Sequence, residues 1–297
     1  MKWRRVKSRD VVDVRGAGGG GGRMPGGAAG VGGGLGAVGL LIFLAFQVLG
    51  GSGGSGFDVT EVFGPAVQAP GAGTPQPIPP AQDPQRQLKD FSVYVFEDAQ
   101  RTWSGTFDRD GQPYDRAQLV LYSGAVQTGG CGGATSAVGP FYCPADGRVY
   151  LDLSFYGDMQ SQLGASGDFA WAYVIAHEMG HHVQDQTGTS DEVGRLSQQS
   201  PDEANELSVR QELQADCYSG VWASTVYAEG DLQRGDLDEA FTASEAVGDD
   251  RLQSQASGRV DPDSFTHGTS EQRRRWFTTG YESGDPAACD TFAADEL

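Results

Sequence analysis

Three of the four histidines in the chain lie within residues 171–186, "WAYVIAHEMGHHVQDQ". His177 and His181 are four residues apart, so on a helix their side chains lie over one another on one face and can share a metal ion. Glu178 borders the same cleft, where a carboxylate can take a proton from water that a catalytic zinc ion activates. The spacing therefore predicts a site for hydrolysis; the alternative is a solvated polar helix end.

A catalytic zinc site needs a third protein ligand. The metzincin extension of the motif fails, because it would need glycine at Gln184 and a ligand at Thr187. In "QELQADC", Glu212 and Asp216 are again four residues apart, so Glu212 can reach the metal while Asp216 accepts the ring N–H of a ligand histidine. The other candidates for this ligand are Glu203, Glu206, Asp185 and His267.

Two further histidines lie near the motif or follow it. His182 is five residues after His177, on the wrong side of the helix to join the pair, which predicts a packing or surface role. His267 opens "HGTSEQRRRW", where Thr269 can cap a helix and Gln272, three residues later, can form the reciprocal hydrogen bond of a capping box. A histidine fixed just ahead of a helix can lean over the metal and donate to the oxyanion that forms when water attacks a carbonyl. The alternative for His267 is a structural hydrogen bond in a loop.

The elements that must position these side chains follow from periodicity. Helical spacing of apolar residues predicts helices over 84–107, 167–186, 202–228, 236–253 and 269–284, with 190–201 a polar connection. Two strands are predicted, over 117–124 and 148–155, the second with Val149, Leu151, Leu153 and Phe155 inward and one polar face. Strands mixed among helices in this way predict an α+β domain.

The composition changes ahead of this domain. Residues 1–30 form a basic, glycine-rich tail, and residues 31–50 supply about the 20 residues without charge that a membrane-spanning helix needs. A cleaved signal peptide is the alternative, but no Ala-x-Ala-like site follows. Basic residues before this stretch and none just after it predict a single-pass anchor in the cell membrane, with the N-terminus in the cytoplasm and the domain outside. Residues 51–85 read as a Gly/Ser/Pro-rich linker, which leaves 86–297 for the folded domain.

The charge balance narrows the class of partner. Removing the net +5 of residues 1–30 from the chain total of −19 leaves −24 on the rest. Such an acidic surface disfavours nucleic acid and anionic lipid as partners and favours solubility.

All four cysteines lie in the predicted outside domain, where an even count favours disulfides. Of the three connectivities we favour Cys131 with Cys143 and Cys217 with Cys289. On its helix Cys217 points about 140° away from Glu212, which removes it as a ligand. The alternative is four reduced, buried thiols; a zinc cluster is disfavoured because no two cysteines have Cys-x2-4-Cys spacing.

Several linked runs resemble the putative neutral zinc metallopeptidase family of bacteria over about residues 86–292. They are "GPFYCPADGRVYLDLSFYGDM", "YVIAHEMGHHVQ", "RQELQADCYSGVWA", "AVGDDRLQ" and "FTHGTSEQRRRWFTTGYESGD". This resemblance, and likeness to the wider gluzincin clan, imply a zincin-like domain with one zinc ion held by His177, His181 and Glu212. They also imply Glu178 as general base, Asp216 behind the ligands, and an extended peptide docked along the strand before the motif helix, here 148–155.

The function expected is a membrane-anchored zinc metallopeptidase that cleaves peptide bonds of a protein or peptide substrate without a covalent intermediate. The competing hypothesis is a membrane-tethered binding or assembly module whose zinc site is structural or degenerate. Three protein ligands with an open fourth position argue against a structural site, which four ligands would close.

Overall fold

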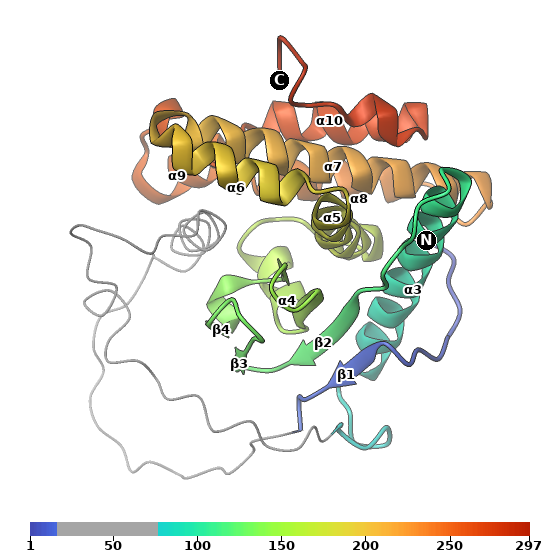
Figure 1. Ribbon diagram of the computed structural model, residues 1–297. Helices are drawn as coiled ribbons and strands as arrows, with labels where there is room; N and C mark the ends of the chain where they lie inside the picture. Colours follow the sequence, from blue (N-terminus) through green and yellow to red (C-terminus); the bar gives the residue numbers. More distant parts are fainter. Residues whose placement is uncertain (17–76) are drawn as a thin grey trace, which may run out of the picture.

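The computed structural model describes residues 1–16 and 77–297, and most helices of these residues gather on one side of a small mixed sheet (Figure 1). The helices are α3 (Arg86–Arg109), α4 (Phe155–Ser161), α5 (Asp168–Gln186), α6 (Thr189–Gln199), α7 (Ala204–Ala228), α8 (Asp236–Ala246), α9 (Asp249–Ser257) and α10 (Ser270–Ser283). The strands are β1 (Val11–Asp13), β2 (Gln118–Tyr122), β3 (Ala125–Gln127), β4 (Gly133–Thr135), β5 (Phe141–Cys143) and β6 (Arg148–Asp152). The predicted α+β class, mostly helical with a small sheet, is confirmed.

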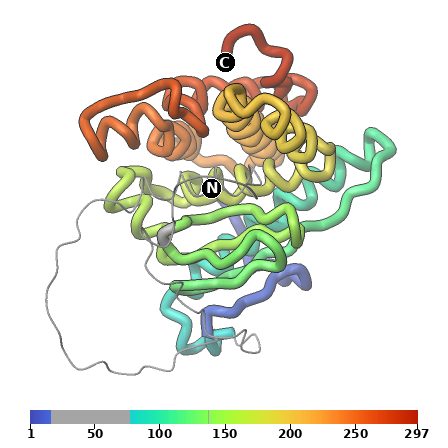
Figure 2. Tube along the Cα trace, turned by 60° about the vertical axis from the view of Figure 1, so that its left-hand side comes forward, coloured from blue at the N-terminus to red at the C-terminus, as the bar shows by residue number. Residues whose placement is uncertain are grey.

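Helix α5, which carries the His-Glu-x-x-His motif, lies between the sheet and the other helices. It contacts α7, α8 and α3, and Figure 2 shows the green strands on one side of it and the orange and red helices on the other. Phe169, Trp171 and Ile175 of α5 are fully buried in one core with Leu119 and Leu151 of the sheet. Because burial of each large apolar side chain contributes about 1.5–3 kcal/mol, this core holds the motif helix firmly in place.

The main sheet of the described residues has the strand order β1-β2-β6-β5. β1 and β2, and β2 and β6, are parallel, whereas β5 runs antiparallel to β6. Both edges of β6 are therefore paired, so the prediction that a peptide adds to the strand at 148–155 is wrong. The end strand of this sheet that contacts α5 is β5.

The predicted polar face of the strand at 148–155 is also wrong, because a second layer covers it. Tyr150 stacks on Phe141 with ring centroids 4.8 Å apart. The carboxylate of Asp152 accepts hydrogen bonds from the backbone N–H of Gly124 at 2.9 Å and from the Ser136 hydroxyl. Both Tyr150 and Asp152 are 1% exposed, so this face of the strand is buried beside β3 and β4. The strand ends at Asp152, and Phe155 already begins α4.

Two helical segments differ from the prediction. The predicted polar connection at 190–201 is mostly helix α6, which packs on α7 and α5 and buries Val193 and Ser197. The stretch at 236–253 divides into α8 and α9 at Val247 and Gly248. A Cβ atom at Gly248 would lie 2.4 Å from the backbone nitrogen of Ser270, so glycine permits the close approach of α10 at this break.

Residues 1–16 pack on the domain, whereas the sequence assigned them to a flexible tail separated from it. Val11 pairs with Leu119 in the parallel ladder of β1 and β2. Trp3 packs edge-on against Phe91 of α3 with ring centroids 5.5 Å apart. The side chains of Arg15 and Asp83 are both 0% exposed and form an ion pair at 2.7 Å. The folded unit therefore includes residues on both sides of the predicted anchor and linker, and does not begin at residue 86.

The predicted anchor at 31–50 and most of the predicted linker at 51–85 lie outside the described residues. Within residues 1–16 and 77–297, no helix combines the length and apolar character needed to cross a bilayer.

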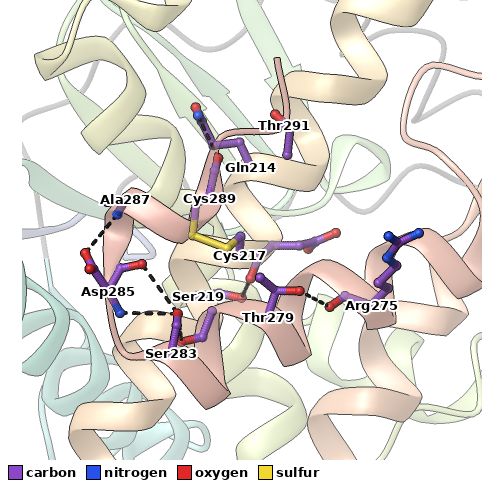
Figure 3. Close-up of a disulfide and its surroundings, with 12 residues drawn as sticks. Gln214, Cys217, Ser219, Arg275, Thr279, Ser283, Asp285, Ala287, Cys289 and Thr291 are labelled. Carbon is purple, nitrogen blue, oxygen red and sulfur yellow. Dashed lines mark hydrogen bonds between the residues drawn. A yellow bond between two sulfur atoms is a disulfide. The ribbon is translucent and has the colours of Figure 1, made fainter. Parts of the chain in front are cut away.

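Both predicted disulfides are present. One joins Cys131 to Cys143 at the end of β5, and the other joins Cys217 of α7 to Cys289 after α10. In Figure 3 the second bond ties the C-terminal segment to α7, where Gln214 donates to the carbonyl oxygen of Cys289 at 3.1 Å. This cross-link fixes α7 and the segment after α10 to each other.

Candidate metal centre

The two motif histidines and Glu212 converge between α5 and α7. Nε2 of His177 lies 3.2 Å from Oε2 of Glu212, and Nε2 of His181 lies 3.4 Å from Oε1. The three donor atoms lie within 4.8 Å of one another. Ligand atoms about 2.0–2.2 Å from a tetrahedral zinc ion are themselves about 3.3–3.6 Å apart. The three side chains therefore fit one face of a tetrahedral site and leave the fourth position open.

The outer nitrogen of each histidine has a hydrogen-bond acceptor. Nδ1 of His177 lies 2.9 Å from Oδ1 of Asp216, and Nδ1 of His181 lies 2.9 Å from Oε1 of Gln184. Because each Nδ1 carries a hydrogen for its acceptor, Nε2 is the nitrogen of each ring that is left to bind a metal, on the side of Glu212. The structure thus places Asp216 behind a ligand histidine, as predicted.

Gln184 is a site residue that sequence reasoning missed. Its amide nitrogen donates to the carbonyl of Gln211 at 2.7 Å and to Oε1 of Gln214 at 3.0 Å. These two bonds use both amide hydrogens, so the amide oxygen must face His181. The available signal was its spacing of three residues from His181, but the sequence could not show that α7 would supply both acceptors.

Arg273 and Tyr173 were also missed. Arg273 donates to both carboxylate oxygens of Asp216, at 2.9 and 3.0 Å, and is 2% exposed. The Tyr173 hydroxyl donates to Oδ1 of the same carboxylate. This buried cluster holds Asp216 in one orientation and so fixes the ring of His177. "QRRRW" offers three arginines, and only the crossing of α10 over α7 decides which one faces the site.

Glycines allow the three helices to come this close. A Cβ atom at Gly180, inside the motif, would lie 2.9 Å from the carbonyl oxygen of Ala215 on α7. A Cβ atom at Gly280 of α10 would lie 1.9 Å from the carbonyl oxygen of Cys217, and one at Gly220 would lie 2.1 Å from that of Phe277. Side chains at these positions would separate the helices and move Glu212 and Arg273 away from the histidines.

The buried charges favour a cation. Burial opposes a charge on His177, but Asp216 and Glu212 outweigh it and raise the pKa of His177 to about 10. Burial likewise opposes the charge on Glu212, yet His181 and His267 lower its pKa well below the usual value. A site that attracts protons this strongly also attracts a metal ion, which competes with the protons for the same nitrogen atoms.

Glu178 lies in the wall of the same cavity. It is 8% exposed, and burial raises the pKa of its carboxyl group above the usual value. A carboxylate with a raised pKa is a stronger base, as a proton acceptor in hydrolysis needs to be.

His267 lines this cavity from the loop before α10. Asp249 holds the loop, because one oxygen of its carboxylate accepts the backbone N–H groups of Thr266 and His267, each at 2.7 Å. Thr269 and Gln272 form the predicted capping box at the start of α10. His267 is therefore fixed beside the metal centre, and its role toward an oxyanion stays a prediction.

The other candidate ligands point elsewhere. His182 bonds through Nε2 to the carbonyl of Asp115 at 2.7 Å and packs between Tyr114 and Tyr142, which is the predicted packing role. Asp185 accepts a hydrogen bond from Tyr142 at 2.7 Å. Glu206 pairs with Arg210 at the surface, and Glu203 has an exposed side chain, so neither joins the three ligands.

The open side of the metal centre faces a cavity of about 520 Å³. Its walls combine the polar centre with apolar side chains from the segment around β5 and from α4 and α5, among them Val138, Phe141, Phe155 and Val174. Such a cavity can hold several residues of a substrate beside the ligands.

Comparisons with known proteins identify the family of the chain. The chain is 45% identical to the Escherichia coli K12 protein YpfJ over 293 residues, which cover 98% of this chain and 99% of YpfJ. It is 49% identical to the Mycobacterium tuberculosis protein Rv2575 over 195 residues, which cover 62% of this chain and 65% of Rv2575. No solved structure matches. The family model described as "putative neutral zinc metallopeptidase" matches residues 1–292, and the chain belongs to that family.

Proposed function

We propose that this chain is a zinc-dependent metallopeptidase that hydrolyses peptide bonds in protein or peptide substrates. The observation that carries the proposal is the convergence of His177, His181 and Glu212, with an open side toward a cavity bordered by Glu178. Two imidazoles and one carboxylate suit a single catalytic zinc ion. When bound, zinc would polarise the scissile carbonyl group and lower the pKa of water.

The residues of the chain supply the proton transfers. Glu178 takes a proton from the attacking water and delivers it to the departing amine, and its raised pKa suits both steps. His267 donates a hydrogen bond to the oxyanion from the opposite loop. Asp216 and Arg273 move no proton; they hold the ring of His177 so that its Nε2 stays directed at the centre.

An extended substrate docks along β5. This strand ends the sheet on the side that contacts α5, and Tyr142 and Phe141 line the cavity. A peptide that adds to the strand edge forms backbone hydrogen bonds independent of its sequence, while its side chains enter the apolar wall. The substrate class is therefore an unfolded or extended polypeptide with apolar side chains near the cleaved bond.

We place the catalytic domain outside the cytoplasm, because two disulfides join its four cysteines. Attachment to the membrane through residues 31–50 stays a prediction that rests on the sequence.

The test is cleavage of an unfolded, fluorescently labelled protein by the full chain, with bound metal measured by mass spectrometry. Glu178→Gln is expected to retain zinc and lose at least about 100-fold in rate, because it removes the proton acceptor. Glu296→Gln, an exposed change far from the site, is the matched control and keeps the rate of the native chain.

Equal cleavage by the native chain and by Glu178→Gln would overturn the peptidase proposal. Zinc bound stoichiometrically, with no cleavage of any unfolded protein, would favour the competing binding or assembly module.

A further inference from the structure

His182, the third histidine of "HEMGHH", is not part of the metal centre, yet it is buried, with 2% of its surface exposed. Nε2 of His182 lies 2.7 Å from the carbonyl oxygen of Asp115, so this nitrogen carries the hydrogen and donates it. Nδ1, which then carries no hydrogen, lies 3.1 Å from the hydroxyl oxygen of Tyr142, and because that hydroxyl gives its single hydrogen to Asp185, the two rings meet by packing rather than by a hydrogen bond. The ring therefore connects the segment before β2 to the end strand β5.

Tyr142 completes the connection back to the motif helix. Its hydroxyl donates to Oδ2 of Asp185 on α5 at 2.7 Å, and its ring packs on that of His182 with centroids 5.4 Å apart. Tyr142 is the middle residue of β5 and also lines the cavity. One side chain thus sets the distance between the strand edge and the helix that carries the metal ligands.

Tyr142 of β5 and the proposed general base Glu178 of α5 line the same cavity. A shift of β5 along or away from α5 would therefore change two things together, the docking edge for the substrate and the surroundings of Glu178.

We propose that His182 and Tyr142 are positioning residues that clamp the substrate-binding strand β5 to the catalytic helix α5. The clamp holds an extended peptide in register with the metal centre; neither residue touches the metal or moves a proton in the reaction. This inference rests on the proposed peptidase function for its consequence, and on the contacts of His182, Tyr142 and Asp185 for its geometry.

The test separates peptide docking from metal binding by using two inhibitors on the zinc-loaded full chain. Acetohydroxamate contacts only the metal, whereas a pentapeptide hydroxamate built from leucine and alanine binds the metal and also lies along β5. Tyr142→Phe keeps the ring and removes the hydroxyl, and His182→Phe removes both ring nitrogens. Each substitution is expected to lower the affinity for the pentapeptide hydroxamate by about tenfold, because the contacts along β5 are misplaced. The affinity for acetohydroxamate and the zinc content should not change.

His182→Gln provides the rescue, because its amide can still donate to the carbonyl of Asp115; it is expected to recover part of the lost affinity. Tyr227→Phe, which removes a hydroxyl from a side chain that is 64% exposed, is the matched control. The clamp is overturned if Tyr142→Phe and His182→Phe bind the pentapeptide hydroxamate as the native chain does, or if acetohydroxamate weakens equally. Because neither inhibitor needs turnover, these affinities decide the clamp even if the native chain cleaves no peptide, which would refute the peptidase proposal alone.

Discussion

The metal centre and the cluster around Arg15 bury charge in opposite ways. At the Arg15 cluster, Arg15 and Lys89 face Asp13 and Asp83, so two positive groups meet two negative ones. At the metal centre, Arg273 is the cationic side chain against the carboxylates of Asp216 and Glu212. The first cluster is balanced by its own side chains, whereas the second needs further positive charge, which protons on the histidines or a bound metal ion supply.

This difference separates a structural ion cluster from a functional one. A buried charge is costly unless it is paired, so an unbalanced set persists where a ligand completes it. The histidines beside Glu212 are neutral when they bind a metal, and the missing positive charge is then the ion. The balanced cluster instead joins residues 1–16 to α3, and none of its four residues lines the cavity.

The strongest consequence of the Arg15 cluster concerns membrane topology. Because Val11–Asp13 form a strand of the domain's sheet, we expect residues 1–16 on the same side of the membrane as the domain. The test uses two single-cysteine variants, Arg9→Cys, at a side chain that is 87% exposed, and Glu296→Cys, at an exposed position. Intact cells without their outer wall are treated with a maleimide that cannot cross the membrane. We expect both cysteines to react, or both to be protected. If the cysteine at position 296 reacts and the one at position 9 is protected, residues 1–16 lie in the cytoplasm as the sequence predicted, and their packing on the domain is contradicted.

The next largest effect is expected when Arg15 is removed from the balanced cluster. Arg15→Gln leaves the carboxylates of Asp13 and Asp83 buried beside Lys89 alone, which should lower the free energy of unfolding by about 3–5 kcal/mol. Urea unfolding followed by tryptophan fluorescence measures this. Arg9→Gln, at an exposed position, should change it little. Zinc affinity of the folded Arg15→Gln variant should match the native value, and a parallel loss of zinc would show that the two regions are not independent.

Asp216→Asn tests the unbalanced cluster. The amide cannot hold the Nδ1 hydrogen of His177 as a carboxylate does, and it leaves Arg273 without its ion pair. Zinc affinity, measured by competition with a chromophoric chelator, is expected to fall about 10–100-fold. Asp263→Asn, in an exposed turn, serves as the control. An Asp216→Asn protein that binds zinc as tightly as the native chain would remove Asp216 from the site.

The smallest expected effect is a pH dependence at the His267 loop. Burial opposes the charge on Asp249, but bonds from His267 and from backbone N–H groups outweigh it, so the pKa of this carboxyl group lies below the usual 3.8. A lowered pKa means that the stabilisation is present above pH 3.8 and is lost as the pH falls through the lower folded value.

Asp249→Asn should therefore reduce stability at neutral pH by about 1–2 kcal/mol. Its difference from the native chain should shrink as the solution is acidified below pH 3.8. Thermal unfolding at a series of pH values checks this. A difference that is constant with pH would mean that the charge of Asp249 contributes nothing to holding the loop.

Sequence reasoning succeeded where spacing along one helix determines which side chains meet. His177 with His181, and Glu212 with Asp216, are pairs four residues apart, and helix geometry alone places each pair on one face. It failed where a partner comes from a distant element. Gln184, Tyr173 and Arg273 became site residues only because α7 crosses α5, and α10 crosses α7, at glycines, and no local pattern encodes these crossings.

The same limit explains the strands. A three-residue strand such as β1 or β5 is too short for alternation to show, and the polar side of β6 is buried because β3 and β4 cover it. By itself, the sequence determined through helical spacing which side chains share a face, His177 with His181 and Glu212 with Asp216, and through the even count of cysteines that disulfides were to be expected. Only the tertiary structure decided which strand edge faces the metal, which arginine supports it and where residues 1–16 lie, because these depend on contacts between residues far apart in the chain.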